Sequence, residues 1–137
     1  MKIVIIDGQG GKVGRSITEK LKQKAPDLEL TVIGTNSIAT ANMLKGGAEQ
    51  GATGENPVVL AAETADIIVG VIGIAIPQSL LGEVTPKMAE AIGKSRAQKI
   101  LIPSSRCNNF VVGTENYTLT DLVEGAANKI ISITNSK

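Results

Sequence analysis

The sequence predicts an α/β fold, a three-layer Rossmann-like domain in which a mostly parallel sheet carries helices on both faces. Apolar runs typical of buried strands alternate with segments of helical periodicity along the chain. The chain also opens with an apolar strand, a glycine-rich turn and a helix, an arrangement suited to receiving a phosphate. Because 137 residues are enough for one hydrophobic core, we expect a single nucleotide-binding-type domain over residues 1–137.

The first strand and helix are the most clearly marked elements. Lys2–Asp7 is a continuous apolar run that ends in a turn, as expected of a strand buried on both faces. Val13, Ile17 and Leu21 are four residues apart and form one face of a helix that ends near Lys24. This pattern predicts that the glycine turn connects a buried strand to an amphipathic helix.

The remaining elements follow from apolar runs, caps and breakers. Residues 73–83 are ambiguous because they are apolar but contain proline and glycine. The other segments predict a strand over Leu28–Ile33, a helix capped by Asn36 or Ser37 and ending at Gly46-Gly47, a loop over Ala48–Pro57, strands over Val58–Ala61 and Asp66–Ile72, a helix from Thr85-Pro86 to Gly93, a strand over Lys99–Ile102, a short strand over Phe110–Val112, and a terminal helix that begins at Thr118 with Asp121.

Composition excludes several classes of function. The net charge is +1 and the only aromatic residues are Phe110 and Tyr117, which argues against a nucleic-acid partner. The most apolar segment, Ile67–Ile76, is far shorter than a membrane span, so no membrane partner is expected. The single cysteine, Cys107, rules out an intramolecular disulfide and favours a reducing, cytoplasmic location. The absence of histidine excludes histidine-based catalysis and histidine-ligated metals, and we expect no metal site.

The glycine turn is the best candidate for a binding site. Gly8, Gly11 and Gly14 have the spacing G-x-x-G-x-x-G rather than G-x-G-x-x-G, and this spacing resembles the first turn of extended short-chain dehydrogenases and dihydrodipicolinate-reductase-type domains. By position, Gly8 permits a tight exit from the strand and Gly14 permits close packing of the helix. A turn that binds nothing is the alternative. The candidate cofactor-binding residues of this turn are Gly8, Gln9, Gly10, Gly11 and Val13.

Asp7 departs from the usual nucleotide-binding turn. A carboxylate immediately before Gly8 repels a phosphate unless a cation intervenes. We favour a structural role in which its oxygens accept hydrogen bonds from backbone N–H groups of the turn. A Mg²⁺ ligand and a general base are the alternatives.

The turn after the second strand contains Gly34, Thr35 and Asn36 where NAD-binding domains usually have an acidic residue. Hydroxyl and amide groups suit a phosphate better than a ribose diol. These three residues are therefore candidate cofactor-binding residues, and NADP or another nucleotide is the expected cofactor. An ordinary N-cap is the alternative interpretation.

Further candidates follow other strands. Gly70 and Gly73 would allow a ligand close to the backbone, or they mark a strand bulge or a tight helix contact. Arg106 is a candidate for binding a phosphate or carboxylate, or forms a surface ion pair. Cys107 is either a nucleophile or, more in keeping with free cysteines generally, a buried filler. The loop Thr53–Asn56 either covers the site or merely connects two elements.

The chain as a whole resembles a family of short bacterial proteins called domain of unknown function 3842. The segments that carry the resemblance are residues 6–11, 34–40, 51–56, 81–86, 100–103 and 106–108. The resemblance implies that Asp7 is a family trait, and it carries no activity or site assignment.

Three functions remain open at this level. The first is a module that binds a small phosphate-bearing ligand, a nucleotide or dinucleotide. The second is a small homo-oligomeric enzyme with Asp7, Arg106 or Cys107 at a subunit boundary, although Tyr117 lacks the lysine four residues later that reductases use. The third is a structural or assembly protein that binds nothing, in which residues 73–81 form either a self-association surface or a buried core segment. Catalytic residues are not identified.

Overall fold

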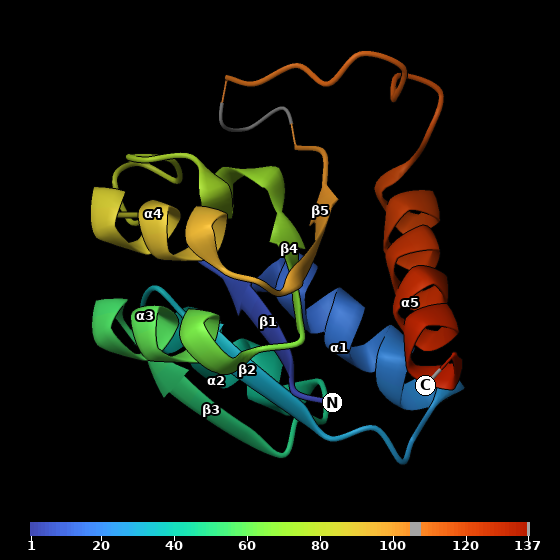
Figure 1. The fold of residues 1–137 in the computed structure, drawn as a ribbon. Helices are drawn as coiled ribbons and strands as arrows, with labels where there is room; N and C mark the ends of the chain where they lie inside the picture. Colours follow the sequence, from blue (N-terminus) through green and yellow to red (C-terminus); the bar gives the residue numbers. More distant parts are fainter. Residues whose placement is uncertain (105–107, 137) are drawn as a thin grey trace.

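A five-stranded parallel sheet with helices on both faces forms the centre of the molecule (Figure 1), which confirms the predicted fold class. The computed structural model describes residues 1–104 and 108–136. Within these residues the strands are β1 (Ile3–Asp7), β2 (Leu30–Gly34), β3 (Gln50–Thr53), β4 (Ile67–Val71) and β5 (Gln98–Ile102), and the helices are α1 (Lys12–Lys24), α2 (Ser37–Lys45), α3 (Glu55–Thr64), α4 (Pro86–Lys94), α5 (Leu119–Asn135) and the short 3₁₀ helix η1 (Ile72–Ala75).

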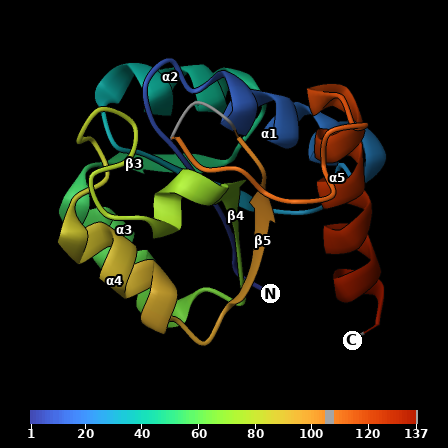
Figure 2. The same cartoon turned by 90° about the horizontal axis from the view of Figure 1, so that it is seen from above.

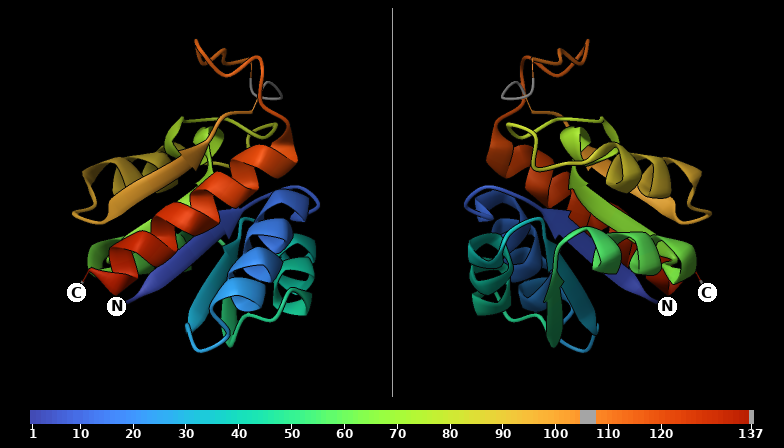
Figure 3. Two further views of the ribbon diagram at one scale, coloured as in Figure 1. Left: turned by 90° about the vertical axis from the view of Figure 1, so that its right-hand side faces the viewer. Right: turned by 90° about the vertical axis from the view of Figure 1, so that its left-hand side faces the viewer.

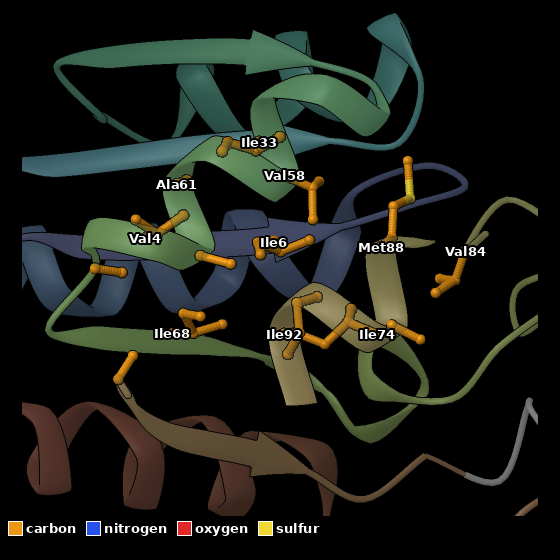
Figure 4. Close-up of a cluster of buried hydrophobic side chains, with 14 of the residues drawn as sticks. Val4, Ile6, Ile33, Val58, Ala61, Ile68, Ile74, Val84, Met88 and Ile92 are labelled. Atoms are coloured by element: carbon orange, nitrogen blue, oxygen red, sulfur yellow. The ribbon is translucent and has the colours of Figure 1, made fainter. Parts of the chain in front are cut away.

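Each face of the sheet has its own hydrophobic core because neighbouring residues of a strand point to opposite sides. Helices α3 and α4 cover one face, and α1, α2 and α5 cover the other (Figure 2). Val4 and Ile6 of β1 pack toward α3 and α4 (Figure 4), whereas Ile3 and Ile5 pack toward α1 and α5. The apolar run of β1 is therefore explained by burial on both faces.

The strand order is β3-β2-β1-β4-β5. The chain moves outward from β1 through β2 to β3, and then returns to the other side of β1 to add β4 and β5. The direction of winding thus reverses between β1 and β4. In doubly wound sheets, ligands bind beyond the carboxyl ends of the strands at this reversal.

Helix caps confirm several predicted starts. The Asn36 side chain accepts a hydrogen bond from the N–H of Ala39, and the Thr85 hydroxyl accepts one from Met88. Thr118 and Asp121 form a capping box at the start of α5. These local signals position α2, α4 and α5 as expected.

The prediction for residues 48–61 is wrong. Gln50–Thr53 forms the edge strand β3 instead of a loop, and residues 58–61 belong to α3 instead of a strand. Three of the four β3 residues are exposed, so the strand has no apolar pattern of its own. Helix α3 tolerates Pro57 because the first N–H groups of a helix have no intrahelical partner.

The later ambiguous segments also differ from expectation. Residues 110–112 do not form a strand; they belong to the irregular segment that leads into α5 (Figure 3). Residues 72–75 form η1, and turns follow as far as Thr85. Among the described residues, no helix combines the length and apolar character needed to cross a membrane.

Candidate functional site

A cleft of about 680 Å³ opens beyond the carboxyl ends of β1, β4 and β5. This volume lies within the usual range for small-molecule sites. The glycine turn lines one part of it, and described residues from 103–104 and 109–117, between β5 and α5, line another part. The described residues that line it are Asp7, Gly8, Gln9, Gly10, Gly11, Lys12, Val13, Val71, Leu80, Pro103, Ser104, Asn109, Phe110, Val111, Thr114, Glu115, Tyr117, Leu119 and Leu122.

The buried Asp7 carboxylate holds the glycine turn in place. Its Oδ1 accepts a hydrogen bond from the N–H of Gly8, and its Oδ2 accepts one from the N–H of Gly14, both at 2.8 Å. These contacts confirm that Asp7 accepts bonds from the turn, as its structural interpretation predicted. The carboxylate thereby accepts a hydrogen bond from Gly14, one of the N–H groups in the first turn of α1. This N–H group would otherwise be available to a bound anion.

The glycines of the turn serve different purposes. Gly11 has φ of 69°, and a Cβ there would lie 2.7 Å from the carbonyl oxygen of Ala39 in α2. A Cβ on Gly14 would collide with Met43 of α2 and lie 2.9 Å from Asp7 Cβ. A Cβ on Gly10 would meet only Lys12 Cγ, at 3.9 Å. Close helix packing thus explains Gly11 and Gly14, whereas Gly10 faces open space.

On the β2 side of the turn, three donors converge on one oxygen of Glu83. Glu83 Oε1 accepts hydrogen bonds from the N–H of Gln9 at 2.8 Å, from the hydroxyl of Thr35 at 2.6 Å and from Nδ2 of Asn36 at 2.8 Å. We call this arrangement the Glu83 latch. The hydroxyl and amide that were predicted to suit a phosphate therefore bind a carboxylate of the chain itself. The latch also connects both turns to the segment before α4.

The absence of a side chain at Gly8 allows the Glu83 carboxylate and the Thr35 hydroxyl to approach each other. A Cβ on Gly8 would lie 2.6 Å from Thr35 Oγ1, 2.8 Å from Leu80 Cδ1 and 2.9 Å from Glu83 Oε1. Any larger residue at this position would therefore separate Glu83 and Thr35. The absent side chain of Gly8 is explained by the latch as well as by the tight exit from β1.

The segment that carries Glu83 has an unusual backbone. Gln78, Leu80 and Leu81 have φ of 68°, 58° and 57°, a left-handed conformation that is costly for residues other than glycine. Leu80 is buried against the core, but Leu81 is 95% exposed. The segment is thus anchored by Leu80 on one side and by the latch on the other.

The donors also change the acidity of Glu83. Burial alone would raise the pKa of its carboxyl group, but the hydrogen bonds from Thr35, from the N–H of Gln9 and from Asn36 outweigh it, so the pKa lies below the usual value. The latch is accordingly an interaction of the charged carboxylate.

The β4–β5 side of the glycine turn has no such internal occupant among the described residues, and the cleft lies here. Lys12 and Val13 begin α1, and their N–H groups have no partner within the helix. Of the other residues that line the cleft, Phe110, Tyr117 and Leu119 are 72%, 59% and 50% exposed. The cleft is thus lined by a helix N-terminus and by exposed apolar side chains, together with Asn109, Thr114 and Glu115 of the same segment.

The structure separates the predicted site residues into two groups. All five candidates of the glycine turn line the cleft, but Gly34, Thr35, Asn36, Gly70 and Gly73 do not. A Cβ on Gly70 would collide with the carbonyl oxygen of Ile6, so sheet packing explains this glycine. Arg106 and Cys107 lie outside the described residues.

The loop Thr53–Asn56, which was expected either to cover the site or to connect two elements, connects β3 to α3. Thr53 ends β3 and Glu55 begins α3, and Glu55 Oε2 accepts a hydrogen bond from the Thr85 hydroxyl at 2.6 Å. None of residues 53–56 lines the cleft.

Sequence reasoning missed Glu83 and the exposed apolar side chains of the cleft. Glu83 is the only charged residue between Asp66 and Lys87, and an isolated charge within an apolar stretch was an available indication of a buried polar contact. Within the described residues, no group of three or more acidic or cysteine side chains could hold a metal ion.

A comparison with solved structures places the fold among known proteins. The chain is similar to the dodecameric FMN-dependent UbiX-like decarboxylase from Escherichia coli O157:H7, with a TM-score of 0.53 and 12% sequence identity over 97% of this chain and 94% of that chain. At this identity the likeness shows the fold alone. None of the curated proteins matches the sequence. A family model matches residues 2–135, and the chain therefore belongs to the family described as Domain of unknown function (DUF3842).

Proposed function

We propose that the protein binds a mononucleotide, with the phosphate at the start of α1 and the ring in the cleft. The observation that carries this proposal is the position of the 680 Å³ cleft at the reversal of the sheet, with the glycine turn as part of its lining. The N–H groups of Lys12 and Val13, the Lys12 ammonium and the helix dipole all favour an anion there. The hydrogen bonds from Gly8 and Gly14 offset part of the charge of Asp7.

The exposed apolar side chains of the cleft favour a flat aromatic group. Phe110 and Tyr117 are exposed rings that line the cleft, and exposed apolar surface of this kind gains stability when a ligand covers it. The structural neighbour is FMN-dependent and has the same fold, which supports a flavin mononucleotide as the first ligand to test.

The NADP alternative meets an obstacle on the β2 side. Thr35 and Asn36, which were expected to receive its second phosphate, already bind Glu83. NADP would therefore have to displace a carboxylate that is held by three hydrogen bonds. This geometry disfavours NADP.

Binding of FMN and riboflavin, measured by flavin fluorescence and by thermal shift, tests the proposal. We expect FMN to bind at least about tenfold more tightly than riboflavin, because only FMN carries the phosphate. Gly10→Asp places a carboxylate in open space at the turn and should abolish the preference for FMN without harming the fold. Gly125→Asp, at an open helical position outside the cleft, is the matched control. Equal affinities for FMN and riboflavin, or no binding of either, would overturn the proposal.

We also propose that the protein is a homo-oligomer in which a second copy packs near the rim of the cleft. Val112 is 85% exposed beside Phe110 and Tyr117, and the structural neighbour is dodecameric. Light scattering should show a species larger than the monomer, and Val112→Asp should shift it toward the monomer. A monomer at micromolar concentration would exclude this part of the proposal.

A further inference from the structure

We propose that Glu83 is an internal anion that decides which nucleotides the cleft accepts: its carboxylate fills a second anion position formed by Gln9, Thr35 and Asn36, so that only a ligand able to displace it can use that position. This inference rests on the proposed nucleotide binding at the glycine turn and specifies its ligand class.

The donors of the latch are arranged as they would be for one oxygen of a phosphate. A backbone N–H, a hydroxyl and an amide N–H from two different turns all point to Glu83 Oε1, at 2.6 to 2.8 Å. Asn36 is held in place from both ends, since its Nδ2 also donates to the carbonyl oxygen of Gln9 at 3.0 Å and its Oδ1 accepts from Ala39. The donors would therefore keep their positions if Glu83 left.

The second anion position is continuous with the cleft. Gln9 belongs to both, because it lines the cleft and its N–H donates to Glu83. Leu80, on the same segment as Glu83, lines the cleft too. Glu83, Thr35 and Asn36 do not line the cleft themselves, so a ligand at the glycine turn would have to extend past Gln9 or Leu80 to reach Glu83.

Glu83 lies on a segment that is buried in part and exposed in part. It lies outside helices and strands, on a segment of turns, and its side chain reaches the latch from 47 residues beyond Asn36 in the sequence. Leu81 is 95% exposed, whereas Leu80 and Val84 of the same segment are buried at 8% and 1%. Because buried residues anchor the backbone on both sides of Glu83, a competing anion would displace its side chain rather than the segment.

The ligand class follows from this competition. A mononucleotide with its phosphate at α1 leaves the latch closed. A dinucleotide with a second phosphate near β2 encounters a negative charge in the position it needs, and repulsion between like charges disfavours it. Glu83 thus selects against a ligand that carries a phosphate at this position.

Thermal unfolding in inorganic phosphate, at constant ionic strength set by chloride, tests the inference. Glu83→Ala should vacate the position, so that its Tm rises by about 5 °C or more at saturating phosphate relative to chloride. The wild type and Glu90→Ala, which removes an exposed carboxylate that pairs with Lys94 on α4, should both show a smaller rise. Equal rises in all three proteins would overturn the inference.

Glu83→Gln keeps an oxygen for the three donors and carries the test if Glu83→Ala does not fold. Because a neutral amide is displaced more easily than a carboxylate, its phosphate-dependent rise should exceed that of the wild type, and a rise equal to that of the wild type would contradict the inference. In a parallel titration, NADP affinity should increase in the Glu83 variants by about tenfold while FMN affinity stays within about twofold.

The two proposals can fail separately. If the wild type does not bind FMN but phosphate stabilises Glu83→Ala, the proposed nucleotide binding is wrong and the second anion position is supported. If the wild type binds FMN but phosphate stabilises neither Glu83 variant, the nucleotide binding is supported and the second anion position is wrong.

Discussion

The two sides of the glycine turn satisfy their polar groups in opposite ways. Toward β2, the N–H of Gln9 and the side chains of Thr35 and Asn36 bind the protein's own Glu83. Toward β4 and β5, the start of α1 faces a 680 Å³ cleft that exposed apolar side chains line in part. Since both sides surround the same turn, the comparison shows that a glycine pattern identifies a place where backbone donors gather, but not what they bind.

The largest expected effect distinguishes the packed part of the turn from the open part. Gly11→Ala should lower the free energy of unfolding by about 2–4 kcal/mol, because the new Cβ meets the α2 backbone and φ is positive. Gly10→Ala should change it by less than about 0.5 kcal/mol, since its Cβ meets open space. Urea denaturation of both variants measures the difference. Similar losses would mean that the two positions are packed alike.

The next effect concerns Asp7, whose carboxylate accepts hydrogen bonds from the turn. Asp7→Asn keeps one acceptor oxygen but turns an NH₂ group toward one of the two backbone donors, so we expect a loss of about 1–3 kcal/mol in the free energy of unfolding. Removal of the negative charge should at the same time tighten FMN binding. Chemical denaturation measures the loss of stability, and an FMN titration measures the affinity. Weaker FMN binding by a folded Asp7→Asn would contradict the prediction and show that the carboxylate contributes to FMN binding.

The pH dependence of stability should reveal the latch. Because the folded-state pKa of Glu83 is lowered, its contribution to stability is complete above the unfolded value and is lost as the pH falls through the folded value. The difference in free energy of unfolding between the wild type and Glu83→Gln should therefore shrink below about pH 4.3. A difference that is constant from pH 3 to about pH 7 would show that the charge of Glu83 is irrelevant to the latch.

The smallest effect is expected on the open side. Lys12 is exposed at the start of α1, so Lys12→Ala should weaken FMN binding by only about threefold to tenfold. The difference should diminish in high salt, which screens exposed charges. Lys94→Ala on α4, outside the cleft, is the matched control and should leave the affinity unchanged. A salt-independent loss would place the Lys12 ammonium in a buried contact.

The sequence by itself determined the elements whose signals are local. The apolar run of β1, the face formed by Val13, Ile17 and Leu21, and the caps at Asn36 and Thr118 all depend on neighbours within one or two turns. Helix α3 also had such a signal, because buried Val58, Ala61 and Ala62 have helical spacing, but Pro57 and the apolar run after it obscured the pattern. The strand–turn–helix unit and the five cleft-lining residues of its turn were predictable for the same reason.

Only the tertiary structure decided what surrounds that turn. Edge strand β3 exists because β2 offers it backbone partners, since its own residues are mostly exposed. The latch joins Glu83 to residues 47, 48 and 74 positions earlier in the chain, and no local pattern encodes such a distance. Among the described residues, a distant carboxylate occupies the donors on the β2 side and a cleft lies on the β4–β5 side. This arrangement arises only when the sheet brings the distant segments together.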